Sequence, residues 1–157
     1  MAGVFIAQCE ECGFEQRVVG HGDYAYRLPE PPDVFLWAQF AWCNSCQKVV
    51  QAEKLLTTAA MEEWSTGSNN RSRRDMERYR QMTASRISSA RCLKCGSSDI
   101  IAATGDWPNY LVLHSLCGGS IVLHHNGSAR LSGTKAYSPE GEYVTTVNGI
   151  LIPGRGY

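Results

Sequence analysis

Cys9-Glu-Glu-Cys12, Cys43-Asn-Ser-Cys46 and Cys92-Leu-Lys-Cys95 decide the fold of this 157-residue chain. In each stretch two residues separate the cysteines, which makes a tight turn that points both sulfurs at one position. Such a turn, with its two metal-binding residues, is called a knuckle. Two such turns supply the four ligands of a tetrahedral zinc ion, with each sulfur about 2.3 Å from the metal. The first metal site is therefore predicted from the first two pairs, Cys9, Cys12, Cys43 and Cys46.

The third cysteine pair is followed by a histidine and a cysteine with the same spacing, His114-Ser-Leu-Cys117. A neutral imidazole nitrogen replaces one thiolate in many structural zinc sites. The second metal site is therefore predicted from Cys92, Cys95, His114 and Cys117, which gives the odd seventh cysteine a role. Because His124 and His125 lie a few residues further along, either of them could supply the fourth ligand instead of His114.

Metal explains these cysteines better than disulfides or a redox centre. Disulfides need an oxidising compartment, and we expect a cytoplasmic protein because Met1–Ile6 does not resemble a secretory signal. A redox Cys-x-x-Cys needs no second pair. Four thiolates suit iron as well as zinc, but the histidine in the second set favours two Zn²⁺ ions. No stretch approaches the roughly 20 apolar residues of a membrane span, so no membrane association is expected.

The regions between the cysteines carry signals for both strands and helices. Apolar residues at helical spacing predict a helix over 47–64, and Ser72 is placed to cap a second helix that runs to about residue 90. A short polar break separates the two, which indicates a helical hairpin. Runs of β-forming residues predict strands over 14–19, 34–42, 99–104, 110–114 and 119–125. Asn126-Gly127 predicts a two-residue hairpin turn, and a further hairpin is predicted over 137–147.

The knuckle sequences Cys9-x-x-Cys12-Gly and His114-x-x-Cys117-Gly-Gly resemble the zinc-ribbon, or rubredoxin-like, class of proteins. In that class two knuckles hold zinc at one end of a small antiparallel sheet. The resemblance implies an α+β protein with two zinc ribbons on either side of the helical hairpin and a C-terminal β-hairpin extension. The domains expected from it are 1–48, 49–90 and 91–157. It does not imply one function, because zinc ribbons occur in proteins of many kinds.

Both predicted metal sites have four protein ligands, so neither leaves a position for water or substrate. Metal of this kind stabilises a fold, and the sequence contains no recognisable nucleophile or phosphate-binding motif. We therefore expect an accessory or adaptor protein that binds another protein, with no small-molecule substrate. An enzyme that uses the metal sites only as a scaffold is a distant alternative.

The arginine-rich stretch 71–91 offers a second reading of function. It holds seven arginines against two acidic residues, whereas 1–35 holds six acidic residues against two arginines. Arginine side chains on one helix could contact nucleic-acid phosphates. The candidate contacts are Arg71, Arg73, Arg74, Arg78, Arg80 and Arg86. The chain has no net positive charge overall, which weakens this alternative.

Overall fold

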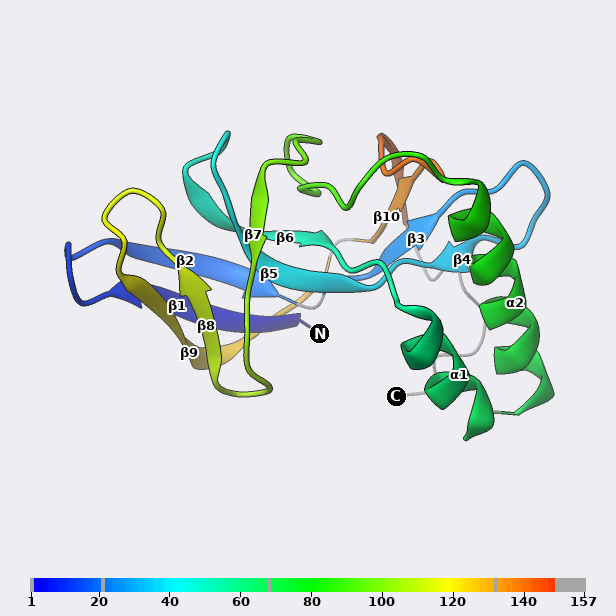
Figure 1. The fold of residues 1–157 in the computed structure, drawn as a ribbon, viewed down its shortest axis with the longest axis horizontal. Coiled ribbons are helices and arrows are strands. Elements are labelled where there is room, and N and C mark those ends of the chain that lie inside the picture. Colours follow the sequence, from blue (N-terminus) through cyan, green and yellow to red (C-terminus); the bar gives the residue numbers. More distant parts are fainter. Residues whose placement is uncertain (1, 21, 68, 132, 149–157) are drawn as a thin grey trace. The chain divides into compact units, whose positions relative to one another are not determined.

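The structure is a computed structural model that describes residues 2–20, 22–67, 69–131 and 133–148 (Figure 1). This part of the chain forms three sheets, mostly antiparallel, and two helices, which confirms the predicted α+β class. The chain folds into two compact units, and each unit is assembled from three separate segments. Unit 1 comprises 1–22, 38–53 and 90–132, and unit 2 comprises 23–37, 54–89 and 133–157. The predicted domains, which followed one another along the chain, therefore differ from the division that the structure gives.

Unit 1 contains a four-stranded antiparallel sheet with the strand order β2-β1-β9-β8. It is made from two hairpins that lie far apart in the sequence: β1 (Ala2–Cys9) with β2 (Glu15–Gly20), and β8 (Tyr110–Leu113) with β9 (Ser120–Ala129). The central strands β1 and β9 join the hairpins in a register that places Cys9 opposite Ile121. The two hairpin turns therefore meet at the same end of the sheet.

Unit 1 also contains a three-stranded sheet, with the order β6-β5-β7. Strand β5 (Ala38–Cys43) forms a hairpin with β6 (Lys48–Glu53), and β7 (Ile100–Ala102) pairs with the other edge of β5. Residues just before β7 run beside β6, where Cys92 bridges to Ala52 and the Leu93 amide donates to the Gln51 carbonyl. The turn at 43–46 and the turn at 92–95 are thereby brought together.

The core of unit 1 consists of side chains from both sheets. It includes Phe5, Val18, Phe40, Trp42, Val49, Val112, Ile121 and Leu123, each at most 6% exposed. Gln16 joins the sheets by hydrogen bonds: its side-chain amide donates to the Val49 carbonyl and accepts from the Val49 amide, both at 2.9 Å. These two hydrogen bonds link β2 to β6, which belong to different sheets.

Unit 2 contains a four-stranded mixed sheet and both helices. The sheet has the order β11-β10-β3-β4, formed by β3 (Tyr24–Tyr26), β4 (Val34–Phe35), β10 (Thr134–Tyr137) and β11 (Tyr143–Val147). Strands β10 and β11 are antiparallel, so the hairpin predicted over 137–147 is confirmed, beginning a few residues earlier. Helix α1 (Thr58–Thr66) and helix α2 (Asn70–Ser85) bury Met61 and, in α2, Met76, Tyr79 and Met82.

Three local predictions differ from the structure. Residues 48–53 form strand β6 rather than the first half of a helix, because five consecutive residues of β6 are buried and this pattern lacks the alternation that identifies a strand. Asn69, not Ser72, caps α2, and its side chain accepts the Ser72 amide at 3.0 Å. Asn126-Gly127 lies inside β9, where pairing with β1 replaces the expected turn. The last part of the predicted C-terminal β extension, 149–157, lies outside the described residues.

Within the described residues, neither helix has the length and apolar character needed to span a bilayer.

Candidate metal centres

The structure brings all eight predicted ligands into two groups of four, but it pairs the knuckles differently from the prediction. The outer cluster, named for its position in the sequence, joins the first and last pairs: Cys9, Cys12, His114 and Cys117. The inner cluster joins the two middle pairs: Cys43, Cys46, Cys92 and Cys95. The predicted sites, which joined consecutive pairs, are therefore wrong. Both pairs of the inner cluster lie between the two pairs of the outer cluster along the chain, and this arrangement is called nested.

Strand pairing accounts for the nested arrangement. Cys9 ends β1, and the turn carrying His114 and Cys117 connects β8 to β9, so pairing of β1 with β9 brings the first and last knuckles together. Cys43 ends β5, and pairing of β5 with β7 places Ile100 opposite Cys43, close to the turn that holds Cys92 and Cys95. His124 and His125 lie exposed on β9 and belong to neither cluster, so His114 is the histidine of the outer set.

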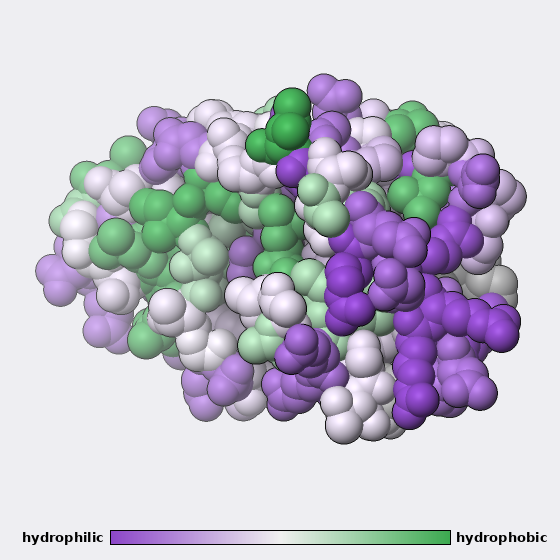
Figure 2. Space-filling model, turned by 45° about the vertical axis from the view of Figure 1, so that its right-hand side comes forward, coloured by the Kyte–Doolittle hydropathy of each residue, from purple (hydrophilic) through white to green (hydrophobic). Residues whose placement is uncertain are grey.

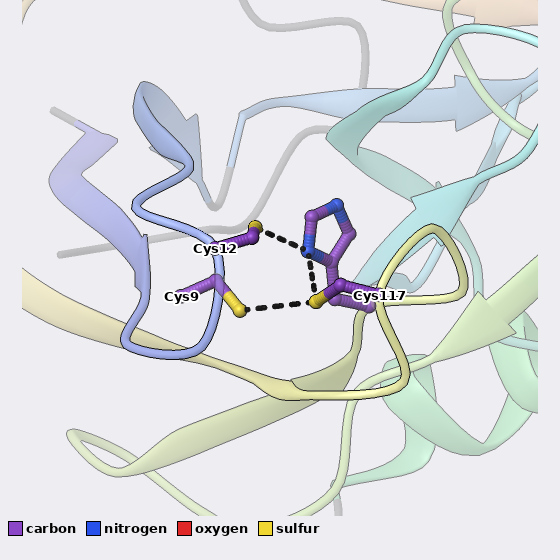
Figure 3. A group of neighbouring side chains, drawn as sticks. Cys9, Cys12 and Cys117 are labelled. Carbon is purple, nitrogen blue, oxygen red and sulfur yellow. Dashed lines mark hydrogen bonds between the residues drawn. The ribbon is translucent and has the colours of Figure 1, made fainter.

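The spacing of the ligand atoms fits a tetrahedral metal ion. In the outer cluster Cys9 Sγ lies 3.6 Å from Cys117 Sγ, and His114 Nδ1 lies 3.4 Å from Cys12 Sγ and 3.2 Å from Cys117 Sγ (Figure 3). In the inner cluster the Cys43–Cys95 and Cys46–Cys92 sulfurs are 3.6 and 4.0 Å apart. A regular tetrahedron with metal–sulfur bonds of about 2.3 Å has edges of about 3.8 Å. All seven cysteines are free thiols, because a disulfide needs sulfurs about 2.05 Å apart.

Each knuckle also directs backbone amides at its sulfurs. Cys46 N donates to Cys43 Sγ, Lys94 N to Cys92 Sγ, and Gly119 N to Cys117 Sγ, each at 3.4 Å. Such donors stabilise a thiolate ligand.

The turns reach this geometry through one residue with positive φ after the last ligand. Gly13, Gly96 and Gly118 have φ between 73° and 76°, as glycine allows at little cost. Gln47 holds the equivalent position in the remaining knuckle, Cys43–Cys46, with φ of 50°. That conformation costs a non-glycine residue about 1 kcal/mol or more.

Within each cluster the thiols differ in their readiness to ionise. Burial disfavours the Cys9 thiolate, but hydrogen bonds from His114, the Cys12 backbone and Cys117 lower the pKa of Cys9 to about 6. Burial raises the pKa of Cys92 to about 11, and burial with hydrogen bonds to Cys95 and Cys43 raises the pKa of Cys46 still further. Several thiolates held this close repel one another, and a divalent cation removes that repulsion. The donor set therefore fits a metal ion better than it fits unliganded thiols.

The two clusters are connected by side chains that lie inside or beside the knuckles. Asn44, between Cys43 and Cys46, accepts hydrogen bonds on Oδ1 from Trp42 Nε1 at 2.9 Å and from Ser115 Oγ at 2.6 Å. Ser115 lies between His114 and Cys117 of the outer cluster. Asn44 Nδ2 also donates to Asp99 Oδ1 at 2.8 Å. Sequence reasoning missed this link, although the polar residues between the ligands were a signal for it.

Aromatic packing fixes the imidazole of the outer cluster. The Trp42 ring lies 4.5 Å from the His114 ring at 66°, and Phe14 lies 5.1 Å from it. His114 directs Nδ1 to the cysteines, while its buried Nε2 has no hydrogen-bond partner among the described residues. The imidazole is therefore held by rings rather than by the carboxylate or carbonyl that usually orients a histidine ligand.

The structure separates the six candidate arginines of the basic stretch into two groups. Arg71, Arg73 and Arg74 are exposed at the start of α2. Arg78 donates to the Glu30 carbonyl, Arg80 pairs with Glu77 at 3.0 Å, and Arg86 donates to the carbonyls of Ser88, Ser89, Pro139 and Glu140. The Arg86 guanidinium therefore links residues 88–89 to residues 139–140 within unit 2. Of the six, Arg71, Arg73 and Arg74 are the exposed ones.

The chain matches no family model, no curated protein and no solved structure.

Proposed function

We propose that both clusters hold structural zinc, and that the protein is a non-enzymatic binding protein whose partner is another protein. The observation that carries the proposal is the completeness of the two ligand sets: four ligand atoms in each lie within 4.8 Å of one another. A closed set of this kind leaves zinc no position for a reacting water. Cys₄ and Cys₃His sets of this type are characteristic of structural zinc.

The way each set is built supports reading both as zinc ribbons. In the outer set two antiparallel hairpins carry one knuckle each, and their central strands pair. In the inner set one knuckle lies in the β5–β6 hairpin and the other precedes β7. On this reading the inner ribbon is inserted between the two halves of the outer ribbon.

Metal analysis and chelation test the proposal together. We expect two zinc ions per chain after purification without added metal. We also expect a strong chelator to abolish the native near- and far-ultraviolet circular dichroism, because structural zinc contributes folding free energy directly. Native spectra after complete removal of zinc would contradict the structural role, and iron in place of zinc would contradict the choice of ion.

Nucleic-acid binding is the second candidate, and the exposure of Arg71, Arg73 and Arg74 together in the first turn of α2 favours it. Three phosphate contacts would give log Kd against log salt a slope of about 2.7 in magnitude for duplex DNA. A gel shift at low salt that reversal of Arg73 and Arg74 abolishes would support this function. If no shift occurs even at low salt, the candidate fails.

A further inference from the structure

The outward face of the four-stranded sheet in unit 1 exposes large apolar side chains among its polar ones. On β8, Val112 points into the core, so its neighbours Leu111 and Leu113 lie on the opposite face, where they are 46% and 50% exposed. In an ordinary antiparallel sheet with one solvated face, that face is mainly polar. Two half-exposed leucines on one short strand therefore require an explanation.

The register continues apolar side chains diagonally across all four strands, and the polar Gln8, Arg17, Ser120 and His124 lie between them on the same face. Leu111 lies opposite Val122 on β9, and Val122 is diagonal to Ile6 on β1. Ile6 is in turn diagonal to Val19 on β2, which is 40% exposed. Neighbours on one face of a sheet at these positions contact each other. Leu111, Leu113, Val122, Ile6 and Val19 together are called the apolar stripe.

The end of the sheet that carries the outer cluster is acidic. Glu15 belongs to the same cross-strand row as Leu111, and Glu10 and Glu11 are exposed in the turn between β1 and β2. Glu11 packs over the facing turn, where a Cβ on Gly119 would lie 2.5 Å from its Cγ. That turn also presents Leu116, which is 61% exposed. Apolar side chains are thus bordered by three carboxylates, and Arg17 is the cation on this face among the described residues.

We propose that the apolar stripe docks a basic amphipathic helix of a partner protein. The charge of the acidic end determines the choice of occupant, because lysines or arginines beside an apolar helix face would meet Glu10, Glu11 and Glu15. A helix packed on an open sheet face is also the ordinary two-layer solution for such a surface. Figure 2 shows hydrophobic surface over the part of the molecule that contains this sheet, and hydrophilic surface over α2. The inference rests on the proposed role as a protein-binding protein.

The test uses the zinc-loaded full chain and a synthetic helical peptide of about 18 residues with leucines on one face and lysines on the other. A second peptide carries glutamates in place of the lysines. Fluorescence anisotropy at low salt measures both affinities. We expect the lysine peptide to bind at least tenfold more tightly than the glutamate peptide, with leucine methyl NMR shifts centred on Leu111 and Leu113.

Variants locate the site. Leu111→Ser with Leu113→Ser should weaken lysine-peptide binding at least tenfold, and Glu10→Lys with Glu15→Lys should weaken it severalfold and reduce its salt dependence. The matched controls lie in unit 2. Ile87→Ser removes a side chain that is 95% exposed, and Glu62→Lys with Glu63→Lys makes the same charge change on α1. Both controls should bind within twofold of the wild type.

Several outcomes would overturn the proposal. They are equal binding of the two peptides, unchanged binding by the leucine variant, or an equal loss in the controls. Self-association that the leucine variant abolishes would overturn it in favour of a second copy of the chain. Zinc content and circular dichroism are measured on every variant. A protein with two zinc ions and no peptide binding refutes the stripe alone, whereas one without structural zinc refutes the proposed function.

Discussion

The nested pairing of the knuckles can be separated from consecutive pairing by two double variants. Cys12→Ser with Cys117→Ser removes two ligands from the outer cluster and none from the inner cluster. Cys12→Ser with Cys46→Ser removes one ligand from each cluster. If consecutive knuckles paired instead, the consequences of the two variants would be exchanged.

The two variants should differ in the number of firmly held zinc ions: one in Cys12→Ser with Cys117→Ser, and none in Cys12→Ser with Cys46→Ser. A four-ligand structural zinc is held with about 10 to 16 kcal/mol in isolated zinc-finger peptides, and two remaining ligands cannot approach this. The first variant therefore keeps one chelator-resistant zinc, in the inner cluster. The second variant keeps two three-ligand sites, which a strong chelator strips far more readily.

The assay combines zinc counting by native mass spectrometry with alkylation of unliganded thiols. In the first variant Cys43, Cys46, Cys92 and Cys95 should resist alkylation, while the remaining Cys9 reacts. The reciprocal variant, Cys46→Ser with Cys95→Ser, should protect the outer cluster and so controls for general unfolding. One resistant zinc in the Cys12→Ser, Cys46→Ser variant, with Cys92, Cys95 and Cys117 protected, would refute the nested pairing.

Four further outcomes follow from the geometry of unit 1. Gly20→Ala should lower the free energy of unfolding by about 1–3 kcal/mol in urea titrations, because its Cβ would lie 2.2 Å from Phe40 Cζ and the core must shift. Gln47→Gly should leave the thermal midpoint unchanged or raise it, since relief of the positive φ offsets the added flexibility of the unfolded chain, whereas Gln47→Val should lower it. Asn44→Ala should speed loss of zinc from the outer cluster as well as the inner, because it removes the acceptor for the Ser115 hydroxyl. A faster loss confined to the inner cluster would show that this hydrogen bond does not stabilise the outer cluster. Zinc retention measured with an indicator dye should fall steeply as pH falls, since protons compete with the metal for every thiolate and for the imidazole.

The eight residues of the two clusters were predictable, and their grouping was not. A Cys-x-x-Cys turn is local, so four residues suffice to recognise it. All the knuckles are chemically similar, however, and their grouping depends on strands that pair over more than 100 residues, such as β1 with β9. Joining Cys9 to Cys117 instead of Cys43 roughly triples the enclosed chain and costs only about 1 kcal/mol more in loop closure. Burying Phe5, Ile121 and Leu123 outweighs that cost, at about 1.5–3 kcal/mol each.

Secondary structure was harder to predict where burial is two-sided or where tertiary pairing overrides a local signal. Residues 49–53 of β6 are all buried, the polar Gln51 and Glu53 included, so the strand lacks the apolar–polar alternation by which a half-buried strand is recognised. Asn126-Gly127 is a strong turn signal, yet pairing of β9 with β1 extends the strand through it. Arg86 could not be distinguished from its neighbours by sequence, because its role depends on carbonyls contributed from residues 139 and 140.

The nested clusters have a consequence for the whole chain, because they fix where the segments of unit 2 begin and end. Residues 23–37 leave after β2 and return at β5, and residues 54–89 leave after β6 and return just before Cys92. Strand β2 pairs with β1, which ends at Cys9 of the outer cluster, and β6 pairs with β5, which ends at Cys43 of the inner cluster. The ends of both segments are therefore held in unit 1. Each closure removes conformational freedom that unit 2 would otherwise lose on its own folding. A metal ion held by either cluster would therefore stabilise unit 2 through chain connectivity, although all eight residues of the two clusters belong to unit 1.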